Sequence, residues 1–163
     1  MRPHVQRSIS AFSFIECVFA MGIVSVFFVA LYALNSRCLL VLNSGRESAA
    51  AQQALHDRIE QLRGCTYTQI TDASYLQSTL LCTATNSSAN LSSPTETVTI
   101  NAYPATINPQ VKVVRTGGSA SVVTSNASMA NQEMVRIDVS QTWVSRPGGR
   151  QRTQAATIVI SKS

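Results

Sequence analysis

Residues 12–34 read FSFIECVFAMGIVSVFFVALYAL and contain a single charged side chain, Glu16. The eighteen consecutive residues from Cys17 to Leu34 carry no charge at all. A helix rises about 1.5 Å per residue, so a helix of this length extends over about 34 Å and is long enough to cross a bilayer. The segment therefore predicts a membrane-spanning helix close to the start of the chain.

The eleven residues before this helix are polar and basic, with Arg2 and Arg7 and no acidic residue. Positive charge before a span predicts that the N-terminus stays in the cytoplasm and that the rest of the chain is exported. A conventional cleaved signal peptide is the alternative, but its apolar core usually has about 7–15 residues and ends at a pair of small residues. The candidate cleavage sites near Ala30 and Ala33 fit this small-residue pattern poorly, because the bulky Leu31 and Tyr32 flank them.

Glu16 is the unusual residue of the span, because a carboxylate in hydrocarbon costs about 2.5–3.5 kcal/mol on insertion scales. Such a residue persists where it has a partner or a function, and a carboxylate that snorkels to the interface is the simpler alternative.

A second, amphipathic helix segment follows the span. No proline occurs between Pro3 and Pro94. Apolar residues then recur at spacings of four, four and three, which is the pattern of one helix face. They are Ala51, Leu55, Ile59 and Leu62. Charged residues are expected on the other faces: Arg46, Glu47, Asp57, Arg58, Glu60 and Arg63. Gly64 marks the expected end of the helix.

Residues 64–163 are expected to form an exported head, with a loop over 65–96 and an antiparallel sheet over 97–163. The clearest strand is predicted over 134–144, where apolar and polar residues alternate, and 153–160 is the returning strand. Gly117-Gly118 and the segment 146–150 are the expected turns. The amphipathic helix is expected to cover the apolar face of this sheet, which gives an α+β head.

Two of the four cysteines, Cys65 and Cys82, lie in the predicted loop of the head. In an oxidising compartment a disulfide between them is expected, and closing so short a loop stabilises by about 3 kcal/mol. Two free thiols are the alternative. Cys17 is expected to act as a small apolar residue of the span. Cys38 lies near the outer end of the span, where a buried free thiol and a bond to another chain are both open.

The rest of the composition excludes several function classes. The chain has 163 residues, 13% of them charged, and a formal net charge of +5. No nucleotide-binding, zinc-hydrolase or serine-hydrolase motif occurs, and the two histidines, His4 and His56, are far apart. We expect no enzymatic activity, no metal site and no cofactor. Arg146, Arg150 and Arg152 cluster near the last turn, which is either a solvated tip or a weak DNA-binding surface.

Residues 11–24, AFSFIECVFAMGIV, resemble the class III leader of type IV pilins and pseudopilins. That pattern is a short basic leader, a small residue, Phe, Ser or Thr, two apolar residues, Glu and a long apolar helix. Two positions depart from it: Ala11 stands where Gly is usual, and Cys17 where an aliphatic residue is typical.

The resemblance implies that prepilin peptidase cleaves between Ala11 and Phe12 and methylates Phe12, and that Glu16 pairs with the new amine of a neighbouring subunit. It implies a leader over 1–11, a transmembrane and filament-core helix over 12–34, an amphipathic continuation over 35–63 and a periplasmic head.

The function implied is a minor subunit of a type IV pilus or type II secretion-like filament, held first in the inner membrane. Its expected partners are other pilin subunits and the peptidase. The alternatives are a signal-anchored periplasmic protein that never polymerises, and a DNA-binding or adhesive minor pilin. The resemblance leaves open whether the machine serves a pilus, secretion or competence.

Overall fold

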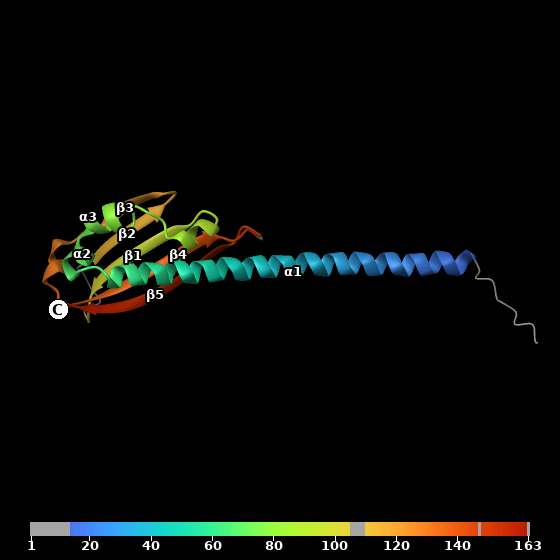
Figure 1. The fold of residues 1–163 in the computed structure, drawn as a ribbon, viewed down its shortest axis with the longest axis horizontal. Helices are drawn as coiled ribbons and strands as arrows, with labels where there is room; N and C mark the ends of the chain where they lie inside the picture. The colour runs from blue at the N-terminus through green and yellow to red at the C-terminus, as the bar shows by residue number, and fades with distance from the viewer. Residues whose placement is uncertain (1–13, 105–109, 147, 163) are drawn as a thin grey trace, which may run out of the picture. The chain divides into compact units, whose positions relative to one another are not determined.

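The computed structural model describes residues 14–104, 110–146 and 148–162 (Figure 1). It divides into two compact units, the first ending at Val41 and the second covering Leu42–Ser163. The elements follow the chain in this order: α1 (Phe14–Arg63), α2 (Tyr67–Thr71), α3 (Ala73–Tyr75), η1 (Leu76–Leu80), η2 (Asn86–Asn90), β1 (Thr95–Ala102), β2 (Gln110–Thr116), β3 (Ser119–Thr124), η3 (Ala127–Asn131), β4 (Met134–Val144) and β5 (Gln151–Ser161).

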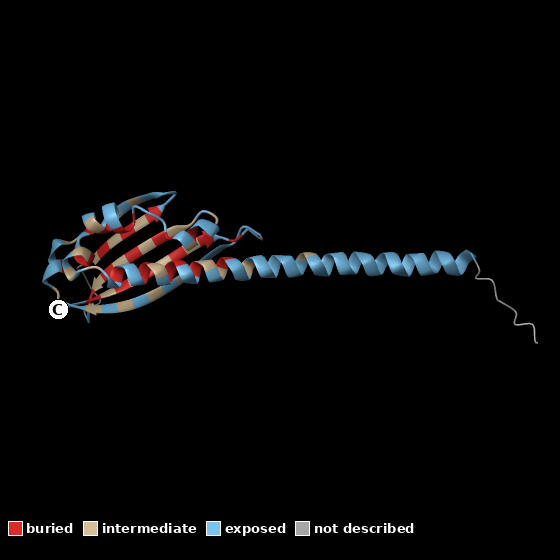
Figure 2. Ribbon diagram, viewed as in Figure 1, coloured by how far each residue is buried: buried red, intermediate tan, exposed pale blue. Residues whose placement is uncertain are grey.

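In its described part, the first unit consists of the first half of α1, and its side chains are almost all exposed (Figure 2). α1 runs without interruption to Arg63, so both predicted helix segments belong to one helix of 50 residues. Gly64 follows its last residue, as expected, and the Gly64 amide donates to the carbonyl of Glu60 at 3.1 Å.

The second unit, which we call the head, is built on a five-stranded sheet with the order β3-β2-β1-β4-β5, every neighbouring pair being antiparallel. Strands β1, β2 and β3 are joined in sequence, and β4 then returns to pair with the free side of β1. The central register places Val98 opposite Val113 on one side and Val139 on the other. The predicted α+β architecture is confirmed.

The core of the head lies between the last turns of α1 and one face of the sheet. The four predicted residues of the amphipathic stripe are all buried, from 0% exposed at Ala51 to 9% at Ile59. Three of them, Leu55, Ile59 and Leu62, meet the inward side chains of the strands, among them Val98, Ile100 and Ile137, which are 0% exposed. Ala51 packs instead with Leu91 and Trp143. The helix stripe and the strand alternation therefore face each other, as the two periodicities predict.

The predicted loop over residues 65–96 is wrong, because the segment folds into short helices α2, α3, η1 and η2 before β1 begins at Thr95. Local caps start the first two: the Thr66 amide donates to the Gln69 side chain at 2.8 Å, and the Ser74 amide donates to Asp72 at 2.9 Å. Buried Ile70 joins these turns to the core. Helices this short carry too few residues to show a helical period in the sequence.

Strand β3 is also new relative to the sequence prediction. It completes the hairpin at Gly117 and Gly118, whose φ angles of +60° and +93° suit the tight turn. Its alternation is short: only Ala120 and Val122 are half-buried against the core, and Val123 then breaks the pattern, which leaves too few repeats to identify a strand from the sequence.

Candidate functional site

The candidate assembly segment surrounds Glu16, which lies in the first turn of α1 and is exposed. Ala11 and Phe12, the expected processing site, lie outside the described residues. Cys17 is exposed and free. The structure thus places the acidic residue at the start of the apolar helix, where the sequence puts it.

The apolar residues after Glu16 present bulky side chains that nothing in the described chain covers. Phe19 is 68% exposed and Tyr32, near the other end of the stretch, is 76% exposed. So long an exposed apolar surface requires a lipid or an apolar partner. By length and composition α1 can cross a membrane, and it is the only helix in the described part of the chain that can.

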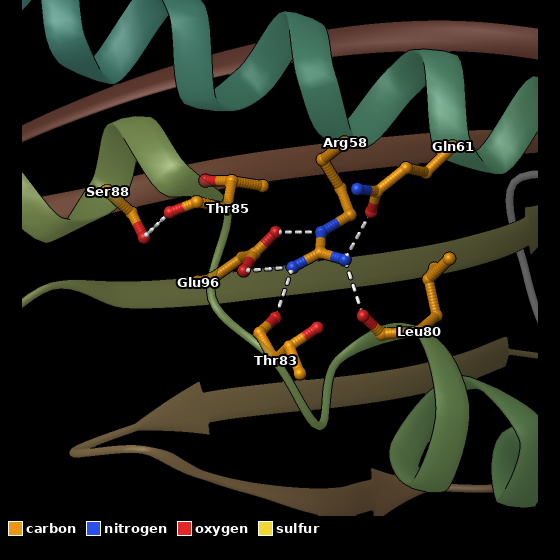
Figure 3. Close-up of polar contacts among 7 residues, drawn as sticks. All are labelled: Arg58, Gln61, Leu80, Thr83, Thr85, Ser88 and Glu96. Carbon is orange, nitrogen blue, oxygen red and sulfur yellow. Dashed lines mark hydrogen bonds and ion pairs between the residues drawn. The ribbon is translucent and has the colours of Figure 1, made fainter.

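A buried ion pair joins α1 to β1 inside the head (Figure 3). Arg58 Nε donates to Glu96 Oε1 at 2.5 Å and Arg58 Nη2 donates to Glu96 Oε2 at 3.0 Å. Arg58 is 1% exposed and Glu96 is 2% exposed. The two-point geometry satisfies both carboxylate oxygens, which is the condition under which a buried pair is tolerated.

The same guanidinium also holds the chain that leads from η1 to η2. Its Nη1 donates to the Leu80 carbonyl and to the Gln61 side chain, and its Nη2 donates to the Thr83 carbonyl at 3.0 Å (Figure 3). Arg58 therefore ties three segments together, namely α1, β1 and the connection that precedes β1. Its position, far from solvent, makes it a structural cation rather than a reactive one.

The Arg58–Glu96 pair belongs to a polar row that crosses the sheet. Glu96 on β1 lies opposite Arg115 on β2 and Gln141 on β4, and Gln141 lies opposite Gln154 on β5. Gln141 Nε2 and Gln154 Oε1 are buried and have no hydrogen-bond partner in the structure. This row interrupts the apolar face at one register of four strands.

A second buried carboxylate, Glu47, fixes the β4–β5 hairpin to α1. Its oxygens accept from Ser145 Oγ at 2.8 Å and from the Arg146 amide at 3.1 Å. Burial raises the pKa of Glu47, but these hydrogen bonds, with further contributions from Trp143 and the positive charge of Arg152, outweigh it and hold the pKa below the ordinary value of 4.5. Glu47 therefore favours its ionised form in the folded head.

The expected disulfide between Cys65 and Cys82 is absent, because both cysteines are free thiols in the structure. Cys65 Sγ donates to the Gln61 carbonyl at 3.2 Å and Cys82 Sγ donates to the Thr79 carbonyl at 3.1 Å. Each thiol thus bonds to a carbonyl of its own local turn, within four residues along the chain. The structure corresponds to the alternative of two free thiols.

The three hairpin arginines, Arg146, Arg150 and Arg152, are all exposed around the β4–β5 turn. Trp143 is 1% exposed and belongs to a small apolar cluster with Ala51 and Leu91. Its indole ring therefore cannot stack on a base, and stacking is a main source of affinity in single-strand binding. DNA binding by this hairpin stays an untested prediction.

Sequence reasoning missed Glu47 and Arg58, which it placed on the solvent faces of the helix. Both are buried, at 8% and 1% exposed. A signal was present: Glu47 lies four residues before Ala51, and Arg58 lies four before Leu62, so each belongs to the stripe. Glu96 likewise alternates in step with Val98 and Ile100 along its strand, so it faces the same side of the sheet as they do. Glu47 and Arg58 were assigned to the other faces of the helix because they are charged.

No protein-family model, no curated protein and no solved structure matches this chain.

Proposed function

We propose that this chain is a minor pilin or pseudopilin, a structural subunit of a type IV pilus or type II secretion-like filament. The observation that carries the proposal is α1, a single helix with an acid in its first turn, an exposed apolar first half and a last half that packs on an antiparallel sheet. In this proposal the apolar half is the membrane anchor before assembly and the filament core afterwards.

The order of the residues supports the same proposal. A polar, basic leader precedes the helix, Ala11 and Phe12 form the bond that prepilin peptidase would cleave, and Glu16 follows four residues after the new N-terminus. An ammonium group on a neighbouring subunit would then neutralise the carboxylate within the apolar core. A charge in such surroundings is tolerated only when it is paired.

The proposed topology follows from the charge before the span. Arg2 and Arg7 favour a cytoplasmic N-terminus in the inner membrane, which places the head in the periplasm. The chain performs no chemistry in this proposal and is itself the substrate of the peptidase.

The first test is the mature N-terminus, read by mass spectrometry of the membrane fraction. A chain that begins at methylated Phe12 supports the proposal. A chain that begins at Met1 supports the uncleaved signal anchor instead, and a start beyond Tyr32 indicates an ordinary secreted protein.

The second test asks whether Glu16 is needed for assembly. Glu16→Ala should insert into the membrane normally and fail to enter sheared filaments, because the subunit amine loses its carboxylate. Glu60→Ala is the matched control, since Glu60 is an exposed acid on the same helix. Normal incorporation of the Glu16 variant would reject the assembly role.

A further inference from the structure

A cavity of about 630 Å³ lies at the end of the sheet where β1 begins and β2 ends. Its apolar wall includes Leu91, Pro94 and Val144, and Arg115 lines it as its only charged side chain. A volume of this size lies in the range of small-molecule pockets, which are mostly apolar and carry a few polar groups.

Arg115 is the unusual member of this cavity. The residue is 8% exposed, and its Nε is buried without a hydrogen-bond partner. None of the ion pairs among the described residues includes it. An N–H donor withdrawn from water without an acceptor is costly, so the Nε of Arg115 is left unsatisfied in the structure.

The nearest acid along the sheet does not complete it. Glu96 lies opposite Arg115 in the β1–β2 register, but both of its carboxylate oxygens accept from Arg58. Two arginines therefore occupy the buried row with one carboxylate between them. The geometry calls for a second anion, on the side of Arg115 that faces the cavity.

We propose that this cavity binds the carboxylate of a small ligand with a short apolar body, with Arg115 as the group that recognises the anion. A planar carboxylate matches the fork of a guanidinium and can accept from two of its N–H groups at once. Leu91, Pro94 and Val144 contact the apolar body. This inference concerns the head alone and does not depend on whether the chain assembles into a filament.

The carboxylate can come from a free organic acid or from the C-terminus of an apolar peptide, and two probes distinguish these sources. Isovalerate represents the free acid and N-acetyl-Val-Leu the peptide. Isovaleramide and the amidated peptide are the matched neutral controls. The readout is the NMR signal of the Arg115 Nε–H, assigned by its loss in Arg115→Lys, in the full-length protein in detergent micelles.

We expect a saturable downfield shift of this signal with at least one carboxylate probe and none with its amide. Arg115→Gln should weaken the binding at least about ten-fold. In this variant the binding is measured from the NMR signals of the Gly117 and Gly118 backbone amides, which line the cavity. Arg63→Gln, which removes an exposed arginine from α1, should leave the affinity unchanged.

Binding of isovalerate identifies free acids as sufficient ligands, and binding of the peptide alone identifies a polypeptide C-terminus. Failure of both probes to shift the signal overturns the proposal, and so does equal affinity of the acid and its amide. If Arg115→Gln does not fold, as judged by the fluorescence of the buried Trp143, the comparison of acid with amide in the unmodified protein still decides.

Discussion

The Arg58→Met substitution tests the role of the buried ion pair in the head. It removes the guanidinium that pairs with Glu96, which is 2% exposed, and leaves the carbonyls of Leu80 and Thr83 without this donor. Breaking one side of a buried pair costs about 3–5 kcal/mol, because the remaining charge has neither a partner nor water. A small domain is stable by only about 5–15 kcal/mol in total, so the loss is large.

Urea unfolding of the full-length protein in detergent measures this loss. The chain has one tryptophan, Trp143, which is 1% exposed in the head, so its fluorescence reports unfolding of the head. With an m-value of about 1–3 kcal/mol/M, the midpoint of Arg58→Met should fall by at least about 1 M.

Arg63→Met is the matched control for this measurement. Arg63 pairs with Glu60 at 2.7 Å on the same helix, but the two side chains are 58% and 48% exposed. An exposed pair contributes about 1 kcal/mol or less, so this midpoint should barely move.

A double-variant cycle separates the pair from the rest of the site. Arg58→Met with Glu96→Leu should cost less than the sum of the two single substitutions, because neither member of the pair is then left buried without the other. If Arg58→Met costs no more than Arg63→Met, or if the two single effects simply add, the reasoning from the buried pair is refuted.

Three further predictions follow from the head. The difference in unfolding free energy between the natural protein and Glu47→Gln should be largest at neutral pH and should shrink as the pH falls below about 4.5. The reason is that a carboxylate whose pKa is lowered by folding stabilises the folded state while it is ionised, and this stabilisation is lost as it is protonated. A difference that does not change with pH would contradict the role of Glu47. Alkylation of the denatured, unreduced protein should modify all four cysteines in the mass spectrum, whereas two modified cysteines would support the Cys65–Cys82 disulfide. Gly118→Ala should lower the urea midpoint through a strain of about 1–2 kcal/mol at its φ of +93°, and an unchanged midpoint would show that the turn adapts.

Much of the fold could be predicted because its elements are long and periodic. The helix stripe from Ala51 to Leu62 and the alternation along β4 each repeat several times, so the pattern is visible without any knowledge of the partner element. The strand predicted over residues 134–144 matches β4 at both ends. The short helices of 65–96 escaped prediction, since three to five residues are too few to show a period.

The polar sites were harder to predict than the fold. Arg58 and Glu96 are 38 residues apart, and each reads in isolation as a surface charge. Only the sheet register and the position of α1 bring them within hydrogen-bond distance and remove both from water. The same holds for Arg115, whose burial depends on the segments that line its cavity.

The apolar helix, the position of Glu16 at its start and the opposing apolar faces of the head follow from the amino-acid sequence, because they depend on the local order of residues and on helix and strand periods. Tertiary packing decides which charged groups are buried, which arginine pairs with Glu96 and which cavity is lined by an arginine without an ion-pair partner. The physical reason is that the cost of a charge depends on the water and the partners around it, and distant parts of the chain supply both.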